Sequence, residues 1–190
     1  YLRAVSNVLE AGFTNVNAIL HPPGMILGAA WIENTGGNFY YYLDAATPAV
    51  ANLLKTLDLE RIAIGSKWGG NVDPFPDLFA NIGSTSLEAA RKGDYLQTLL
   101  DSQPNHKIMA PQSLDHRYMH EDIPFGLAHI ADLGQIAAVP TPAMNAVIEI
   151  ASITTGRDYW SEARTLTKLG LGEMKQKQIL QLLQEGTGWI

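Results

Sequence analysis

Apolar residues along this 190-residue chain recur mostly three or four positions apart, which is the spacing of amphipathic helices. Turn-forming Gly, Pro and Asn residues separate the periodic stretches from one another. The pattern predicts helices over 17–32, 47–64, a short stretch after Ser86, 95–100, 121–138, 140–153 and 173–185. We therefore expect an all-α domain over residues 1–190, with room for one small hairpin.

Several stretches interrupt this helical pattern. Pro22-Pro23 predicts a kink or a helix restart beside His21, because proline removes backbone hydrogen bonds inside a helix. Residues 34–38 have turn chemistry, and the aromatic run at 39–43 favours a short strand. The Gly- and Pro-rich segment 65–76 is expected to be a loop.

Composition excludes several classes of protein. A net charge of -6 argues against binding to a nucleic-acid backbone, which needs clustered Lys and Arg. The absence of Cys excludes disulfides and thiolate metal sites and fits a cytoplasmic protein. No apolar run is long enough to suggest a membrane span. Because the sequence begins with Tyr1 rather than Met, we expect it to be part of a longer polypeptide.

The densest group of titratable side chains lies at residues 115–122, the charged cluster, in a chain with only 17% charged residues. Within it, Arg117 offers a planar fork for a substrate carboxylate. Asp122 could orient and stabilise a nearby imidazole. The alternative is that Asp122 caps a helix and the two residues form a structural ion pair.

A candidate imidazole for that role is His21, beside the proline pair. Asn17 lies four residues earlier and so shares a helix face with it. A kinked helix could aim such a group into a cleft as a general acid or base. The alternative is a histidine that only forms a hydrogen bond near the kink.

Other motifs carry weaker signals. His116 and His120 have metal-ligand spacing, but no third ligand stands at a fixed distance, so we expect no metal site and favour histidines at the edge of the core. The segment 65–70 does not match a phosphate-binding loop, and no dinucleotide-binding fingerprint occurs in the chain. The polar and aromatic segment 156–171 either lines the same cleft or pins two helices together.

Taken together, the sequence resembles the C-terminal helical domain of the octopine/nopaline (opine) dehydrogenase family. The resemblance extends from about Val5 to about Leu171. The matching pieces, in order, are 17–25 with His21-Pro22-Pro23-Gly24-Met25, 47–50, 115–118, 121–127, 140–142 and 156–159. Each piece is weak alone, and their order makes the resemblance specific.

The resemblance implies a two-domain enzyme with a helical domain like that of the 6-phosphogluconate-dehydrogenase-like enzymes. An N-terminal Rossmann domain, absent from these 190 residues, would bind NAD or NADP. The helical domain would bind an α-keto acid and an amino acid for reductive condensation. By the same resemblance, His21 is the general acid/base, Asp122 its partner and Arg117 the carboxylate clamp, with Asn17 also contacting substrate.

Two other functions remain open. One is a ketoacid or hydroxyacid dehydrogenase of the same two-domain plan that needs no amine. The other is a non-catalytic helical module for dimerisation or ligand binding. The amino acid, the keto acid, the choice between NAD and NADP, and whether the protein forms a homodimer are all undecided by the sequence.

Overall fold

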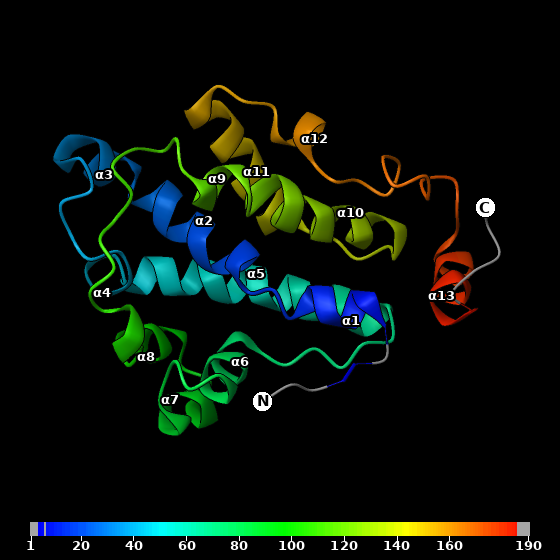
Figure 1. The fold of residues 1–190 in the computed structure, drawn as a ribbon, viewed down its shortest axis with the longest axis horizontal. Helices are drawn as coiled ribbons and strands as arrows, with labels where there is room; N and C mark the ends of the chain where they lie inside the picture. Colours follow the sequence, from blue (N-terminus) through cyan, green and yellow to red (C-terminus); the bar gives the residue numbers. More distant parts are fainter. Residues whose placement is uncertain (1–3, 6, 186–190) are drawn as a thin grey trace.

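Four helices form the centre of the computed structural model, which describes residues 4–5 and 7–185 (Figure 1). They are α2 (Asn17–Leu27), α5 (Pro48–Lys67), α10 (Ala128–Ile136) and α11 (Pro142–Thr155). Helix α2 packs against α5 on one side and α11 on the other, and α10 contacts both α5 and α11. One contiguous apolar core joins these helices, and the all-α prediction is confirmed.

The other helices lie around this centre. They are α1 (Val8–Phe13), α3 (Ala29–Thr35), α4 (Tyr41–Asp44), α6 (Phe75–Asn81), α7 (Leu87–Lys92), α8 (Tyr95–Leu100), α9 (Arg117–His120), α12 (Tyr159–Glu162) and α13 (Gln176–Glu185). A 3₁₀ turn, η1 (Gln103–Asn105), and a π-helical turn, η2 (Ile123–Leu127), complete the described elements. Helices α6, α7 and α8 pack on one another at one side of α5 (Figure 1).

The helix ends agree with their sequence signals. The side chains of Thr47 and Ser86 accept hydrogen bonds from the backbone N–H groups of Val50 and Ala89, which satisfies the first turns of α5 and α7. Gly156 ends α11 in the left-handed conformation, with φ of 69°. The last helix, predicted from residue 173, begins at 176, and α5 runs three residues beyond the predicted end at 64.

The prediction of one helix over 17–32 was wrong in where that helix breaks. Helix α2 continues through Pro22 and Pro23 and ends at Leu27, and α3 begins at Ala29, so that Gly28 separates the two helices. Both prolines are buried, and their burial offsets the hydrogen bonds that their missing N–H groups would have made. Leu27 and Ala30, on either side of this break, are exposed, Leu27 to 52%.

The strand expected over 39–43 was also wrong. Tyr40 forms a single bridge with Met109, and helix α4 starts at the next residue. Two backbone bonds hold the bridge: the Ala110 N–H donates to the Phe39 carbonyl and the Tyr41 N–H to the Ile108 carbonyl, each at 2.8 Å. This short pairing fixes the loop at 108–110 against the start of α4.

The loop expected over 65–76 is shorter than predicted, because α6 begins at Phe75. Phe75 and Phe79, one turn apart, are both buried and their rings pack at 4.3 Å. That spacing, with Pro76 in the first turn, is a helix signal that the surrounding Gly and Pro residues obscured.

The helix expected over 121–138 is divided into η2 and α10, and a separate short helix, α9, precedes it and ends at His120. Pro124 has no N–H to donate, and the helical turn that contains it holds one residue more than a turn of α-helix. The Leu127 N–H donates to the Asp122 carbonyl at 2.8 Å, the five-residue spacing of a π turn. The side chains after Asp122 therefore point in different directions from those that a continuous α-helix would give them.

An ion pair with both side chains completely buried connects α5 to α1, α6 and α8. The Arg61 Nε donates to Asp58 at 2.8 Å, and both side chains are 0% exposed. The same guanidinium donates to the backbone carbonyls of Phe13 and Asp73. Asp58 also accepts from the Tyr95 hydroxyl at 2.6 Å and from the first N–H of α6 at 2.7 Å. These bonds connect α1, α5, α6 and α8.

Candidate active site

His21 and Asp122 meet at the centre of the fold, although 101 residues separate them in the sequence. His21 lies on α2 and is 5% exposed, and its Nδ1 lies 2.6 Å from Asp122 Oδ2. Helix α2 packs against both α9 and η2, the elements on either side of Asp122. A carboxylate at this distance accepts the Nδ1–H and thereby fixes which ring nitrogen carries the proton.

Close packing of η2 on α2 brings the two residues together. A Cβ atom at Gly126 would lie 2.7 Å from the Cβ of Ala18, so only glycine allows this approach. Asp122 makes no side-chain capping bond to η2, and its side chain is 12% exposed. The capping role considered for Asp122 is therefore wrong, since its carboxylate faces the imidazole instead.

Three tyrosines enclose the His21 ring. The Tyr42 hydroxyl lies 2.6 Å from His21 Nε2, and the Tyr118 hydroxyl lies 3.2 Å from that of Tyr42. The Tyr118 ring stacks on the imidazole with centroids 3.7 Å apart and planes 13° apart. Tyr41 donates to the His21 backbone carbonyl at 2.6 Å. Both ring nitrogens and one face of the imidazole are thus in contact with protein groups.

Sequence reasoning did not identify these tyrosines as part of a site. The consecutive aromatic residues at 39–42 were interpreted as strand packing, and Tyr118 entered only as part of the resemblance. A signal was present, since three consecutive tyrosines, 40–42, are unusual in a chain with 8% aromatic residues.

Burial shifts the ionisation of the groups around His21. Burial raises the pKa of Tyr42 well above its usual range, and the hydrogen bond with Tyr118 raises it further. Burial likewise raises the pKa of Tyr41. For His116 burial lowers the pKa, and electrostatic interactions with His21 and with the Arg117 guanidinium lower it further. Both tyrosines therefore remain neutral, and a neutral His116 can accept the hydrogen bond from the Tyr118 N–H at 3.3 Å.

The structure places the expected substrate-binding residues at the surface. The Arg117 side chain is 64% exposed and pairs with Glu121 at 3.0 Å, so the Arg117–Asp122 ion pair considered from sequence is wrong. Asn17 is exposed at the start of α2, one turn before His21. Among the described residues its side chain makes no hydrogen bond to His21, Asp122 or Arg117.

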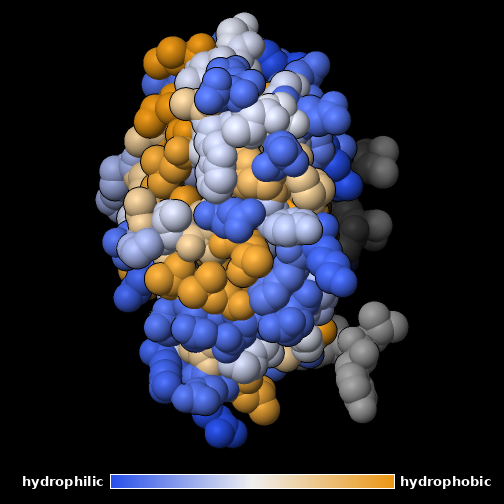
Figure 2. Space-filling view, turned by 90° about the vertical axis from the view of Figure 1, so that its left-hand side faces the viewer, coloured by the Kyte–Doolittle hydropathy of each residue, from blue (hydrophilic) through white to orange (hydrophobic). Residues whose placement is uncertain are grey.

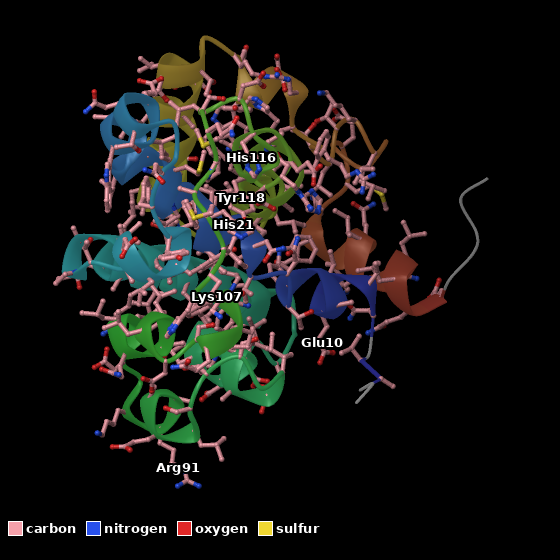
Figure 3. All side chains as sticks on the ribbon, turned by 60° about the vertical axis from the view of Figure 1, so that its left-hand side comes forward. Glu10, His21, Arg91, Lys107, His116 and Tyr118 are labelled. Carbon is pink, nitrogen blue, oxygen red and sulfur yellow. The ribbon has the colours of Figure 1, made fainter. Side chains whose placement is uncertain are left out.

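A hollow of about 460 Å³ adjoins the site. It is lined by the loop 108–113 together with Asp115, His116 and Tyr118. Figure 3 shows His116, Tyr118 and His21 grouped together, with Glu10 and Arg91 well away from them. The face of the molecule that carries α3 and α4 exposes hydrophobic patches among hydrophilic side chains (Figure 2).

The other histidine of the charged cluster, His120, also has protein partners. His120 lies 2.6 Å from Asp115 and 2.8 Å from the Tyr159 hydroxyl.

Within residues 4–5 and 7–185, no three His, Asp or Glu side chains are grouped as a metal site. No helix in this same part of the chain is long and apolar enough to cross a bilayer.

The segment 156–171 packs along η2 and α10, as the pinning interpretation expected. The Arg164 N–H donates to the Pro124 carbonyl at 3.1 Å, and the Leu166 N–H donates to Asp132 at 2.6 Å. Arg157 forms two hydrogen bonds to Glu162, at 3.0 and 2.8 Å.

Comparison with known proteins identifies the family to which this all-α domain, with its His21–Asp122 pair, belongs. Residues 4–155 match the family described as NAD/NADP octopine/nopaline dehydrogenase, alpha-helical domain. This chain belongs to that family.

Individual relatives agree with this assignment. An opine dehydrogenase of Arthrobacter sp. (strain 1C) is 37% identical over 173 residues, which cover 88% of this chain and 45% of the relative. A vitopine synthase of Allorhizobium ampelinum is 25% identical over 177 residues, or 90% of this chain and 46% of the relative. The chain thus spans less than half the length of these curated relatives.

One solved structure has the same fold. It is an octopine dehydrogenase studied with NADH and L-arginine, and it superposes with a TM-score of 0.72 at 16% sequence identity. The similarity covers 99% of this chain and 52% of that one.

Proposed function

We propose that this chain is the substrate-binding and acid/base domain of a longer opine-type dehydrogenase, a cytoplasmic enzyme that condenses an α-keto acid with an amino acid. The observation that carries the proposal is the 2.6 Å contact of His21 Nδ1 with Asp122 inside the family's helical domain. Loss of water from the carbinolamine formed by the two substrates requires a proton on its oxygen. His21 supplies that proton, and Asp122 orients the ring and stabilises the imidazolium.

Arg117 and Asn17 bind the substrates in this proposal. Both substrates carry carboxylates, and a guanidinium binds a carboxylate through two parallel hydrogen bonds. The present partner of Arg117 is Glu121, which is itself 56% exposed, so a substrate carboxylate can replace it without burying an unpaired charge. The Asn17 amide is exposed one turn before His21 and can contact the same substrate.

The nicotinamide cofactor, NAD or NADP, is assigned to the part of the relatives that this chain does not span. The described residues do not fit a principal dinucleotide site, since they contain no strand leading into a glycine-rich turn and helix. Gly65 lies within helix α5, and Gly69 and Gly70 follow that helix rather than a strand. This chain therefore contributes substrate binding and proton transfer.

The test is to follow oxidation of NADH and of NADPH by the full-length protein with pyruvate, with and without a panel of amino acids. We expect oxidation that depends on an added amino acid. Oxidation with the keto acid alone would assign a simple ketoacid reductase. No oxidation with any pair would contradict the proposal and favour a non-catalytic module.

Arg117→Ala in the full-length protein is expected to raise KM for a carboxylate substrate about 10- to 100-fold, because a charge-assisted bidentate contact is lost. Initial rates over a range of each substrate measure the effect. The control is Arg157→Ala, which removes a guanidinium that is also exposed (42%, against 64% for Arg117) and whose partner is Glu162. Unchanged KM values in Arg117→Ala would remove Arg117 from the site.

A further inference from the structure

His21 has no ring nitrogen facing open space. Nδ1 contacts Asp122 and Nε2 contacts the Tyr42 hydroxyl, each at 2.6 Å, and the imidazole is 5% exposed. The Tyr118 ring covers one face. A substrate that met Nε2 directly would have to displace a buried hydroxyl, since Tyr42 is 8% exposed.

A continuous line of hydroxyl groups leads outward from Nε2. The Tyr42 oxygen lies between His21 Nε2 at 2.6 Å and the Tyr118 oxygen at 3.2 Å. Tyr118 is half-buried and lines the hollow beside the loop 108–113, whereas Tyr42 does not. The outer end of this line is therefore Tyr118, at the edge of a space of about 460 Å³.

We propose that Tyr42 and Tyr118 form a hydroxyl relay that carries protons between His21 and a substrate bound in the hollow. The relay rests on the proposed function for its substrate, but its proton path is a property of the fold. Tyr118 is then the catalytic residue that touches the reacting group, and Tyr42 connects it to His21.

In the forward step three protons shift together. The imidazolium Nε2–H passes to the Tyr42 oxygen, the Tyr42 proton to the Tyr118 oxygen, and the Tyr118 proton to the carbinolamine oxygen. The C–O bond breaks as water leaves with its electron pair, and the nitrogen lone pair forms the C=N bond. The imidazole ends neutral, both hydroxyls are restored and the substrate carries the positive charge. Because burial raises the pKa of Tyr42, the hydroxyl exchanges one proton for another and never becomes a free tyrosinate.

The kinetic test compares Tyr42→Phe, Tyr118→Phe and the double variant in the full-length protein. Each single change keeps the ring and removes one hydroxyl, so we expect kcat to fall at least about tenfold with KM changed less than about threefold. Because residues that act as one unit are non-additive, the double variant should be no slower than the slower single variant. Tyr40→Phe, which removes the hydroxyl of the 42% exposed neighbouring residue, should behave like the wild type.

Unchanged or raised kcat in Tyr42→Phe would overturn the relay and show that substrate simply displaces this hydroxyl. A double variant whose loss equals the product of the single losses would also overturn it, because two independent structural roles multiply.

A second measurement separates failure of the relay from failure of the proposed function. Exchange of the His21 ring protons with water can be followed by NMR of the histidine-labelled full-length protein, whatever its activity. The relay predicts slower exchange in Tyr42→Phe and Tyr118→Phe, because the path to water is cut. Faster exchange would mean that the tyrosines only cover the ring, and would overturn the relay. Slower exchange in a protein without opine activity would keep the relay and refute the proposed function.

Discussion

Replacing His21 by Gln in the full-length protein should lower kcat about 10²- to 10⁴-fold, the range by which positioned acid/base groups accelerate reactions. Gln retains a polar side chain near Asp122 and Tyr42 but has no titratable nitrogen. Substrate KM values should change much less, since the ring is 5% exposed and its nitrogens contact protein groups. Steady-state kinetics with saturating cofactor measure both quantities.

The chain offers a matched control for this substitution. His120 also lies 2.6 Å from a carboxylate, that of Asp115, and also contacts a tyrosine hydroxyl. Its carboxylate partner is 88% exposed, and the proposed mechanism does not use it. His120→Gln should keep kcat near the wild-type value. If both variants lost activity equally, the effect would come from general destabilisation, and the assignment of His21 would not stand.

Arg61→Met is expected to lower the free energy of unfolding by about 3–5 kcal/mol, because it leaves Asp58 buried without its counter-charge. Both side chains are 0% exposed, and the substitution also removes the donors to two backbone carbonyls. Tyr95 and the first N–H of α6 would still contact Asp58, so the network would be weakened rather than abolished. Urea unfolding of wild type and variant measures the difference.

Two further variants test the reason for this loss. Arg61→Met combined with Asp58→Leu should recover part of the stability, because no buried charge is then left unpaired. Lys92→Met, which breaks a surface pair with Glu88, should change the unfolding midpoint little. Equal destabilisation by Lys92→Met and Arg61→Met would contradict the role of burial.

The sequence predicted most helices because their signals are local. Thr47 and Ser86 act through N–H groups three residues away, and Gly156 through its own backbone conformation. The break at Gly28 was not predicted, because whether α2 tolerates two prolines depends on their burial in the folded domain. Helix α6 was missed because its two phenylalanines pack on each other within a stretch rich in turn residues.

The candidate site likewise contains residues that could be predicted from the sequence and residues that could not. His21, Asp122 and Arg117 could be proposed from ordered motifs, and the structure brings the first two together. The run of tyrosines at 40–42 marked the segment as unusual, but the contact of Tyr42 with His21 Nε2 could not be predicted, because it depends on where α4 lies against α2. The Asp58–Arg61 pair is i,i+3 on one helix and looks like an ordinary surface pair. Its burial becomes visible only in the fold, where α1, α6 and α8 of the same chain pack over it.

The wide turn η2 has a consequence for how relatives of this protein can vary in length. Each residue added to an α-helix rotates everything beyond it by about 100° around the helix axis. The extra residue between Asp122 and Leu127 therefore sets the angle at which Asp122 projects relative to the buried face of α10. Deleting any one residue from this turn would leave the composition of the site intact and turn its carboxylate away from His21. In this family, the length of 123–127 should be constrained as strictly as the identity of the aspartate.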